Sequence, residues 1–278
     1  MSSTSVEEPP TVAPVGEPAE PNEFRRELLT HWVPRIAGYL AFLGIWQAAA
    51  GTVLPRHLLP APMDIVDKMV EVATSGLLTT HFGATLQKIA IGFGITYVLG
   101  VAIGILMARR WWDAFFRGYV MSTLTTPGLV FALMAAMIFG FSSTGPIVAI
   151  VVTSLPFVIV NVAEGARGLP KELLDMGAAF GVRERDQLRH IVIPFLAPFL
   201  FTALRYGFSV AWKIATLTEV FGSSSGIGFM MRREFQGFSM SGMLAWIFYF
   251  FIFALFLELL LQRAMKHFFR WRQETSVF

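Results

Sequence analysis

The sequence contains no cysteine and few charged residues. Without cysteine, its 278 residues can form no disulfide, no thiolate metal site and no thiol nucleophile. Charged residues make up 15% of the chain, against about 25% in a typical soluble protein. Hydrophobic residues make up 55% and occur in long uninterrupted runs, which a soluble core cannot hide. The sequence therefore predicts an all-α polytopic membrane protein.

The sequence also lacks the motifs of a self-contained enzyme. No GxxxxGKS or GxxxxGKT run occurs, so the chain has no ready cradle for ATP phosphates. The five histidines are scattered and make no metal-ligand spacing. The run GSSSGIG, Gly222–Gly228, matches GxSxG around Ser224, but an all-helical chain offers no strand-to-helix elbow. We predict no catalytic residue, no metal site and no nucleic-acid partner, and we interpret GSSSGIG as a flexible outer loop.

Six apolar runs each approach the ~20 residues that a helix needs to cross a bilayer. They are residues 36–54, 84–107, 118–140, 145–164, 195–217 and 243–263. Gly100 and Gly104 lie four residues apart in the second run. Such a pair of small residues favours close helix packing over contact with a solute.

The distribution of Lys and Arg predicts the orientation. With the N-terminus in the cytoplasm, the inner segments hold fifteen of these residues and the outer segments four. Residues 1–30 form a Pro- and Glu-rich stretch, which we expect to be a disordered cytoplasmic tail rather than a signal peptide. Residues 31–278 then form the transmembrane domain in a bacterial inner (cytoplasmic) membrane, with both termini cytoplasmic. Residues 55–80 lie outside, either as a short amphipathic helix or as a plain connector.

One inner segment is unusually charged for this chain. It reads DMGAAFGVRERDQLRHIVIP, from Asp175 to Pro194. Its spacing is Asp-Met-Gly, three residues, Gly181, nine residues, Ile-Val-Ile-Pro. This resembles the cytoplasmic loop of ABC importer permeases, whose pattern is EAA, three residues, Gly, nine residues, I-x-L-P. A solvated basic loop that merely obeys the positive-inside rule is the alternative, but it does not account for the spacing.

Three other stretches are similar to the nitrate/sulfonate/taurine-type permeases: Leu59–Ile65, Ala84–Ala108 and Leu204–Gly228. The resemblance implies a type I ABC importer permease fold of about six transmembrane helices, working by alternating access on a small anionic solute. It implies a second permease copy, two cytoplasmic ATPase subunits that bind ATP-Mg, an extracytoplasmic solute-binding protein and the membrane lipid as partners. The chain itself is then no enzyme and holds no cofactor. An ion-coupled secondary transporter or channel is the rival, but the inverted repeat and intramembrane carboxylates typical of that class are not evident.

The resemblance also implies a contact with the ATPase in a cytoplasmic coupling loop at about residues 165–194. The implied residues are Asp175, Met176, Gly177, Ala178, Ala179, Phe180, Gly181, Ile191 and Pro194. Independently of the family, a short helix here can seat in a groove of a partner. Ala178, Ala179 and Phe180 would form its apolar face, Gly181 would end it, and Pro194 fits the start of the next span.

Charges inside the apolar runs are candidates for the translocation pathway. Lys213, beside Trp212, can attract an anionic solute; it can instead pair with a carboxylate such as Glu219, or snorkel to the surface. Glu219 and Pro127 are further pathway candidates; Pro127 is the one proline left where many of the resembling permeases read RPIPPLA.

The remaining charges of the apolar runs have less specific interpretations. Arg205 either lines the pathway or pairs with another helix, and Lys88 is expected to snorkel at the outer end of its span. Glu258 lies near the inner end of the last run, where an interfacial position is the simpler interpretation.

Overall fold

The computed structural model describes residues 33–268, which are helical apart from turns and one isolated β-bridge. The predicted tail at residues 1–30 lies outside this range. The helices are α2 (Val33–Ala49), α3 (Pro62–Thr74), α4 (Leu77–Leu106), α5 (Arg110–Thr125), α6 (Gly128–Phe139), α7 (Thr144–Arg167), α8 (Lys171–Ala179), α9 (Glu184–Gln187), the π-helical turn η2 (Leu188–Val192), α10 (Ile193–Gly222), α11 (Ile227–Gln236) and α12 (Met240–Phe268). The all-helical prediction is confirmed.

The chain divides into two compact units, Met1–Pro62 and Met63–Phe278. In the described part of the first unit, α2 buries none of its residues. Its 17 residues are followed by a turn in which Gly51 has φ +84°. The indole N–H of Trp46 donates to the carbonyl oxygen of Pro60 at 3.1 Å and holds the connecting segment against the helix end. The predicted span 36–54 therefore ends earlier than the sequence suggested.

Four helical segments of the second unit are long and apolar enough to cross a membrane, and five if one bent pair is counted. The bent pair is α5 with α6, which meet at 95°, so the predicted span 118–140 is not one straight helix. The cause is Pro127, because proline lacks the amide hydrogen and pushes the residue before it out of the helical region. Thr126 accordingly has φ −82° and ψ 127°.

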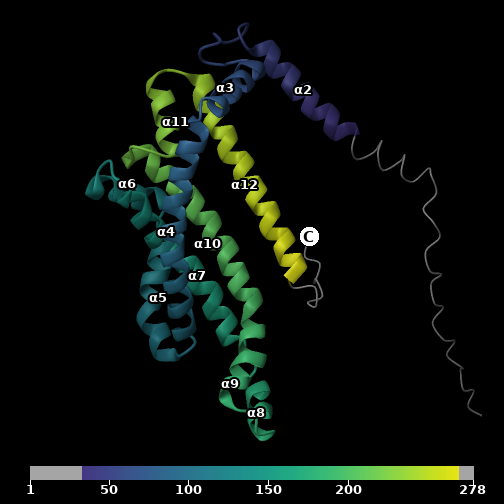
Figure 1. Cartoon of the computed structure of the whole chain (residues 1–278), viewed down its shortest axis with the longest axis vertical. Helices are drawn as coiled ribbons and strands as arrows, with labels where there is room; N and C mark the ends of the chain where they lie inside the picture. The colour runs from purple at the N-terminus through teal and green to yellow at the C-terminus, as the bar shows by residue number, and fades with distance from the viewer. Residues whose placement is uncertain (1–32, 269–278) are drawn as a thin grey trace, which may run out of the picture. The chain divides into compact units, whose positions relative to one another are not determined.

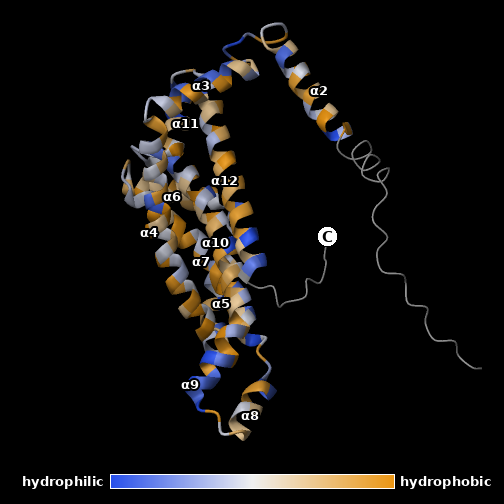
Figure 2. Ribbon diagram, turned by 45° about the vertical axis from the view of Figure 1, so that its right-hand side comes forward, coloured by the Kyte–Doolittle hydropathy of each residue, from blue (hydrophilic) through white to orange (hydrophobic). Residues whose placement is uncertain are grey.

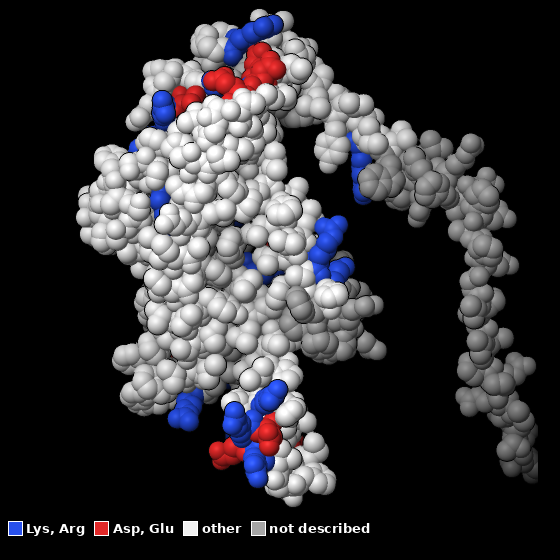
Figure 3. Space-filling view, in the orientation of Figure 1, with Lys and Arg blue, Asp and Glu red and all other residues white. Residues whose placement is uncertain are grey.

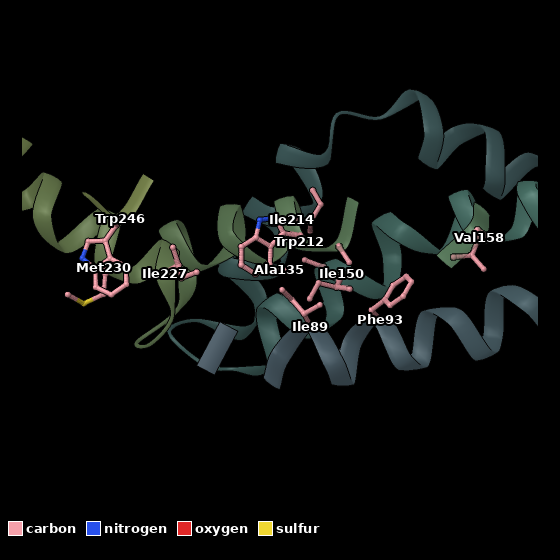
Figure 4. Packing of buried hydrophobic residues seen from close by; sticks show 14 of the residues in the cluster. Ile89, Phe93, Ala135, Ile150, Val158, Trp212, Ile214, Ile227, Met230 and Trp246 are labelled. Carbon is pink, nitrogen blue, oxygen red and sulfur yellow. The ribbon is translucent and has the colours of Figure 1, made fainter. Parts of the chain in front are cut away.

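The core of the second unit forms where α7 packs against α4 and α10 (Figure 1). Val158 and Val162 of α7 are fully buried, and Figure 4 shows Val158 and Ile150 among the side chains of this core. A Cβ at Gly100 would lie 2.6 Å from Val158, and one at Gly104 would lie 2.7 Å from Val162. The two glycines therefore allow α4 and α7 to approach closely, which confirms the packing interpretation.

The predicted amphipathic helix after the first run is present as α3, so the plain connector is rejected. Its apolar face buries Ile65 and Val72, while the ammonium of Lys68 pairs with Glu71 at 2.8 Å on the exposed side. The hydroxyl of Tyr249 on α12 donates to the carbonyl oxygen of Met69 at 2.7 Å. This bond fixes α3 across the start of α12.

Polar and apolar residues are segregated along the second unit. Hydrophobic residues dominate α4, α7, α10 and α12, whereas α9 is hydrophilic (Figure 2). Charged side chains gather at the end that carries α3 and at the opposite end around α9, with a mostly uncharged belt between them (Figure 3). This is the distribution that a lipid bilayer imposes on a spanning unit.

Candidate functional site

The charged segment of the sequence forms a helical hairpin of α8 and α9 at one end of the second unit. It lies opposite the end that carries α3 and α11 (Figure 1). Nearly all its side chains are exposed, and its charges alternate in sign from Arg183 to Asp186. Through η2 the hairpin continues into α10, so residues 184–222 form one nearly continuous helical segment of 39 residues. The hairpin is therefore joined to a spanning helix without an intervening loop.

Gly181 ends α8, as predicted, with φ +70°. The amide of Val182 donates to the carbonyl of Gly177, and the amide of Gly181 to that of Ala178, both at 2.9 Å. These two bonds are the pair that defines a Schellman cap, and the left-handed φ is the reason why glycine suits the position. Gly177 also matters, because a Cβ there would lie 3.2 Å from the amide group of Gln187 on α9.

An apolar stripe is left open on α8. Leu173, Met176 and Phe180 are spaced i, i+3 and i+7, which places them on one face. All three are exposed, Phe180 to 82%. The sequence had suggested Ala178, Ala179 and Phe180 as the apolar face, and Leu173 was missed. Helical periodicity counted from Lys171, the residue with which α8 begins, would have found it.

The other residues predicted for this loop lie in and after η2. Ile191 is half-buried in the π-helical turn, and Pro194 lies in the first turn of α10, as expected for the start of a span. Asp175 is exposed on α8.

A second polar site is buried at the opposite end of the spanning helices. The ammonium group of Lys88 on α4 donates to Glu219 Oε1 at 2.9 Å, to Ser223 Oγ at 3.0 Å and to the carbonyl oxygen of Ser225 at 2.6 Å. All three ammonium hydrogens therefore have acceptors. Lys88 is 3% exposed and Glu219 is fully buried, so this ion pair belongs to the interior.

Glu219 accepts further hydrogen bonds that complete the network. Thr85 donates its hydroxyl at 3.0 and 2.9 Å to the two carboxylate oxygens, and the amide of Gly228 donates at 3.1 Å. The Thr85 oxygen in turn accepts the amide hydrogen of Ile227 at 2.9 Å. We call Thr85, Lys88, Glu219, Ser223 and Ser225 the buried polar network; it joins α4, the end of α10 and the start of α11.

Two sequence-based expectations are corrected at this network. Lys88 does not snorkel to the surface, because a carboxylate on another helix satisfies it more completely than partial hydration would. The GSSSGIG run is not an open loop, because Ser223 is buried and the amide of Gly226 donates to His81 Nδ1 at 3.2 Å. A local signal for the Lys88–Glu219 pair was present on α4. Thr85 and Lys88 lie three residues apart and so form one polar face in an apolar span.

The predicted pathway residues do not converge on one point. Trp212 is buried, with its ring 5.3 Å from that of Phe250 and nearly parallel to it. Glu219 belongs to the buried polar network. Pro127 is exposed at the bend between α5 and α6. Lys213 is exposed on α10, and its suggested partner Glu219 is engaged by Lys88.

Lys213 lies near a second ion pair. Arg205 on α10 pairs with Glu258 on α12, and the amide group of Gln262 donates to the same carboxylate at 3.0 Å. Arg205 therefore pairs with another helix, one of the two alternatives that the sequence left open. Lys213 is close enough to interact electrostatically with Glu258, yet it has no ion pair within 4.0 Å among the residues that the structure describes. Arg205 is therefore the cation that Glu258 binds, and Lys213 lies in the same region without a direct bond to it.

A spanning helical unit with an exposed helical hairpin at one end, and with its buried charges paired, has the features of a transport subunit. The family comparison agrees with this class. The chain belongs to the family described as the binding-protein-dependent transport system inner membrane component, whose model matches residues 97–270. It is an ABC transporter permease, and ATP hydrolysis takes place on a separate subunit.

The similar proteins are named as permeases for different solutes. The chain is 26% identical over 209 residues to the putative aliphatic sulfonates transport permease of Bacillus subtilis, covering 74% of this chain and 76% of that protein. It is 27% identical over 213 residues to the formylaminopyrimidine transport permease of Halalkalibacterium halodurans, covering 76% and 84%. It is 25% identical over 214 residues to the nitrate import permease of Synechococcus elongatus, covering 73% and 76%.

The fold is also found in a solved structure. An inward-facing structure of the MetNI methionine ABC transporter superposes with a TM-score of 0.57, covering 71% of this chain and 97% of that chain. At 18% identity, this likeness confirms the fold and nothing finer.

Proposed function

We propose that this permease subunit imports a small anionic solute by alternating access. Two copies pair about a two-fold axis, because one chain with so few spanning helices is too small to enclose a two-sided pathway. Two cytoplasmic ATPase subunits, which bind ATP-Mg, and an extracytoplasmic solute-binding protein complete the complex. The chain acts in a bacterial inner membrane with both termini cytoplasmic, residues 1–30 forming a tail and residues 31–278 the permease domain.

The α8–α9 hairpin is the proposed contact with the ATPase, within the coupling loop at about residues 165–194. The exposed stripe of Leu173, Met176 and Phe180 supports this, since an amphipathic helix with i, i+3 and i+7 anchors is suited to a hydrophobic groove. The alternating charges beside it suit the choice of partner and of register. Because the hairpin continues into α10, closure of the ATPases would tilt that helix. This part of the proposal names a partner site and does not depend on the solute.

Lys213 carries the proposal of an anionic solute. It is an exposed ammonium in the apolar belt, and within residues 33–268 the nearby carboxylate of Glu258 already pairs with Arg205. The cluster of Arg205, Lys213 and Glu258 therefore has an excess positive charge, for which a solute anion is the natural compensation. The names of relatives give partial support: nitrate, bicarbonate and sulfonates are anions, whereas a formylaminopyrimidine is not.

Replacement of Lys213 tests the solute class. Lys213→Met is expected to assemble with its ATPase but to transport poorly, and Lys213→Arg to retain part of the transport. Lys68→Met is the matched control, because it removes the same charge from an exposed i,i+3 pair on α3. Uptake of candidate anions into vesicles containing the whole complex is the measurement. Normal uptake by Lys213→Met would show that the lysine contacts no solute.

Cysteine labelling tests the orientation, since the chain has no cysteine of its own. Cysteines at the exposed positions Ser143 and Ser224 should react with a membrane-impermeant thiol reagent in intact cells. A cysteine in place of Arg185, which is exposed on α9, should remain unlabelled until the cells are opened. The reverse pattern would invert the topology and place α8 away from any cytoplasmic ATPase.

A further inference from the structure

The first two turns of α5 carry a combination of residues that transport does not explain. Arg109 and Arg110 open the segment, and four aromatic side chains follow within seven residues. We define the α5 basic–aromatic surface as the residues Arg109, Arg110, Trp111, Phe115, Arg117 and Arg167, the last coming from the end of α7.

The aromatic half of this surface is built in two layers. Trp112 and Phe116 stack with ring centroids 5.9 Å apart, and Phe116 packs on the buried cluster that contains Met107 and Ile159. Trp111 and Phe115 stack 6.1 Å apart on the outside and remain 67% and 65% exposed. Trp112 and Phe116 anchor α5 to the core, and Trp111 and Phe115 form an exposed aromatic surface. Tryptophan rings in such a position are typical of the headgroup level of a bilayer.

The basic half is held in place by one carboxylate. Asp113 pairs with Arg117 on its own helix and, at 3.3 Å, with Nη1 of Arg167 on α7. The Nε of Arg167 also donates to the carbonyl oxygen of Ala163 at 3.2 Å. These bonds orient both guanidinium groups and use only part of their five N–H donors. Both side chains remain partly exposed, Arg117 to 57% and Arg167 to 41%.

Arg109 and Arg110 add charge without compensation. Their side chains are exposed and take part in no hydrogen bond or ion pair with residues 33–268. Arg110, Asp113 and Arg117 are spaced i, i+3 and i+7, so they lie on one face of α5. Four arginines thus stand against two carboxylates, Asp113 and the exposed Glu164. In Figure 3 the Lys and Arg at this end of α5 form a patch without red beside it, whereas the patch over α9 mixes both colours.

We propose that the α5 basic–aromatic surface binds the headgroup of an anionic phospholipid. A phosphodiester headgroup matches the exposed guanidinium groups, its charge compensates Arg109 and Arg110, and the acyl chains can run along the apolar face of the spanning helices. Trp111 and Phe115 would lie between the headgroup and the acyl region. The bound lipid would hold the first turns of α5 at the membrane surface. This inference does not rest on the identity of the solute.

The test uses the full-length chain in nanodiscs that contain equal amounts of phosphatidylglycerol and phosphatidylcholine. After extraction, native mass spectrometry counts the lipids that stay bound. The unchanged chain should retain phosphatidylglycerol preferentially, and Arg109→Gln/Arg110→Gln should lower that preference about tenfold. Arg185→Gln/Arg189→Gln removes the same charge from α9 and η2 and serves as the matched control for lipid retention, which it should leave unaltered.

Two results would overturn the proposal. One is an equal lipid preference in the Arg109→Gln/Arg110→Gln variant and the unchanged chain. The other is competition by water-soluble glycerol phosphate, which would mean that the surface binds a free phosphate instead of a lipid. If the double variant cannot be purified, Arg110→Gln alone decides the same question, with a smaller but still selective loss expected for phosphatidylglycerol.

Discussion

The buried polar network and the α8–α9 hairpin both depend on charged residues, but they use them differently. In the network, Lys88 and Glu219 are removed from solvent and every ammonium hydrogen has an acceptor. In the hairpin, Asp175 and the alternating charges from Arg183 to Asp186 are exposed. Buried charges that are fully paired fix the geometry of helices, whereas exposed charges remain available to a partner.

The difference has a consequence for motion. The buried polar network joins α4, α10 and α11 by bonds that a bilayer interior makes costly to break, because no water replaces them there. The ends of these three helices that carry the network should therefore move as one body. The hairpin is attached to the opposite end of α10 by the backbone alone. A displacement of the hairpin can therefore move α10 without breaking the bonds of the buried polar network.

The largest effect is expected from breaking the buried pair on one side. Lys88→Met leaves the Glu219 carboxylate buried without its counter-ion, which should destabilise the fold by about 3–5 kcal/mol. The double variant Lys88→Met/Glu219→Gln removes both charges but keeps an acceptor for the amide of Gly228. It should recover more than half of the loss. Thermal unfolding of the purified chain measures both, and an unchanged midpoint for Lys88→Met would show that the pair does not hold the helices together.

The second effect concerns the close packing of α4 against α7. Gly104→Ala would place a Cβ 2.7 Å from Val162 and 3.0 Å from the carbonyl oxygen of Ile159, a clash that should cost about 1–3 kcal/mol. Gly94→Ala is the matched control on the same helix, because a Cβ there would meet nothing within 4 Å. It should be neutral or slightly stabilising. Equal midpoints for the two variants would mean that α4 and α7 can separate without cost.

These two regions differ in how far the sequence predicted them. The hairpin was predicted in detail, because its signals are local: a spacing motif, a glycine that ends a helix and a proline at the next span. Gly181 and Pro194 lie where those signals placed them. Leu173 was missed because the beginning of α8 was not known, and the phase of the apolar stripe depends on it.

The buried polar network was not predicted, because its partners are far apart along the chain. Lys88 and Glu219 are separated by 131 residues, and no local pattern links them. Lys88 looked like an isolated charge near the end of a span, for which snorkelling was the expectation. Glu219 was considered only as a pathway residue or as a partner of Lys213. The bend at Pro127 had a local signal, yet the apolar run through it concealed the break, since hydropathy reports composition and not helix direction.

A third, smaller effect is expected at the turn of the hairpin. Gly181→Val forces a β-branched residue into a left-handed conformation, which costs about 1–2 kcal/mol locally. Gly181→Asn should be tolerated, since asparagine adopts this region more readily. Protease cleavage between α8 and α9 should increase for valine alone, with little change in the thermal midpoint of the whole chain. A lowered midpoint for Gly181→Val would mean that the hairpin is coupled to the core, which would contradict the difference drawn between the hairpin and the buried polar network.

The smallest effect on the fold should accompany the largest effect on assembly. Phe180→Ala removes a side chain that is 82% exposed, so stability should change by less than about 0.5 kcal/mol. If Phe180 anchors α8 in a groove of the ATPase, its loss should weaken that contact by about 2 kcal/mol, or roughly 30-fold in affinity. Phe238→Ala is the matched control, because Phe238 is 91% exposed at the opposite end, between α11 and α12.

Asp175→Lys should behave like Phe180→Ala, because it reverses a charge on the same short helix without touching the core. Co-purification of the ATPase with each variant is the measurement. Equal recovery with all three variants would leave the exposed stripe without a partner, and α8 would then be a solvated connector whose spacing has another origin.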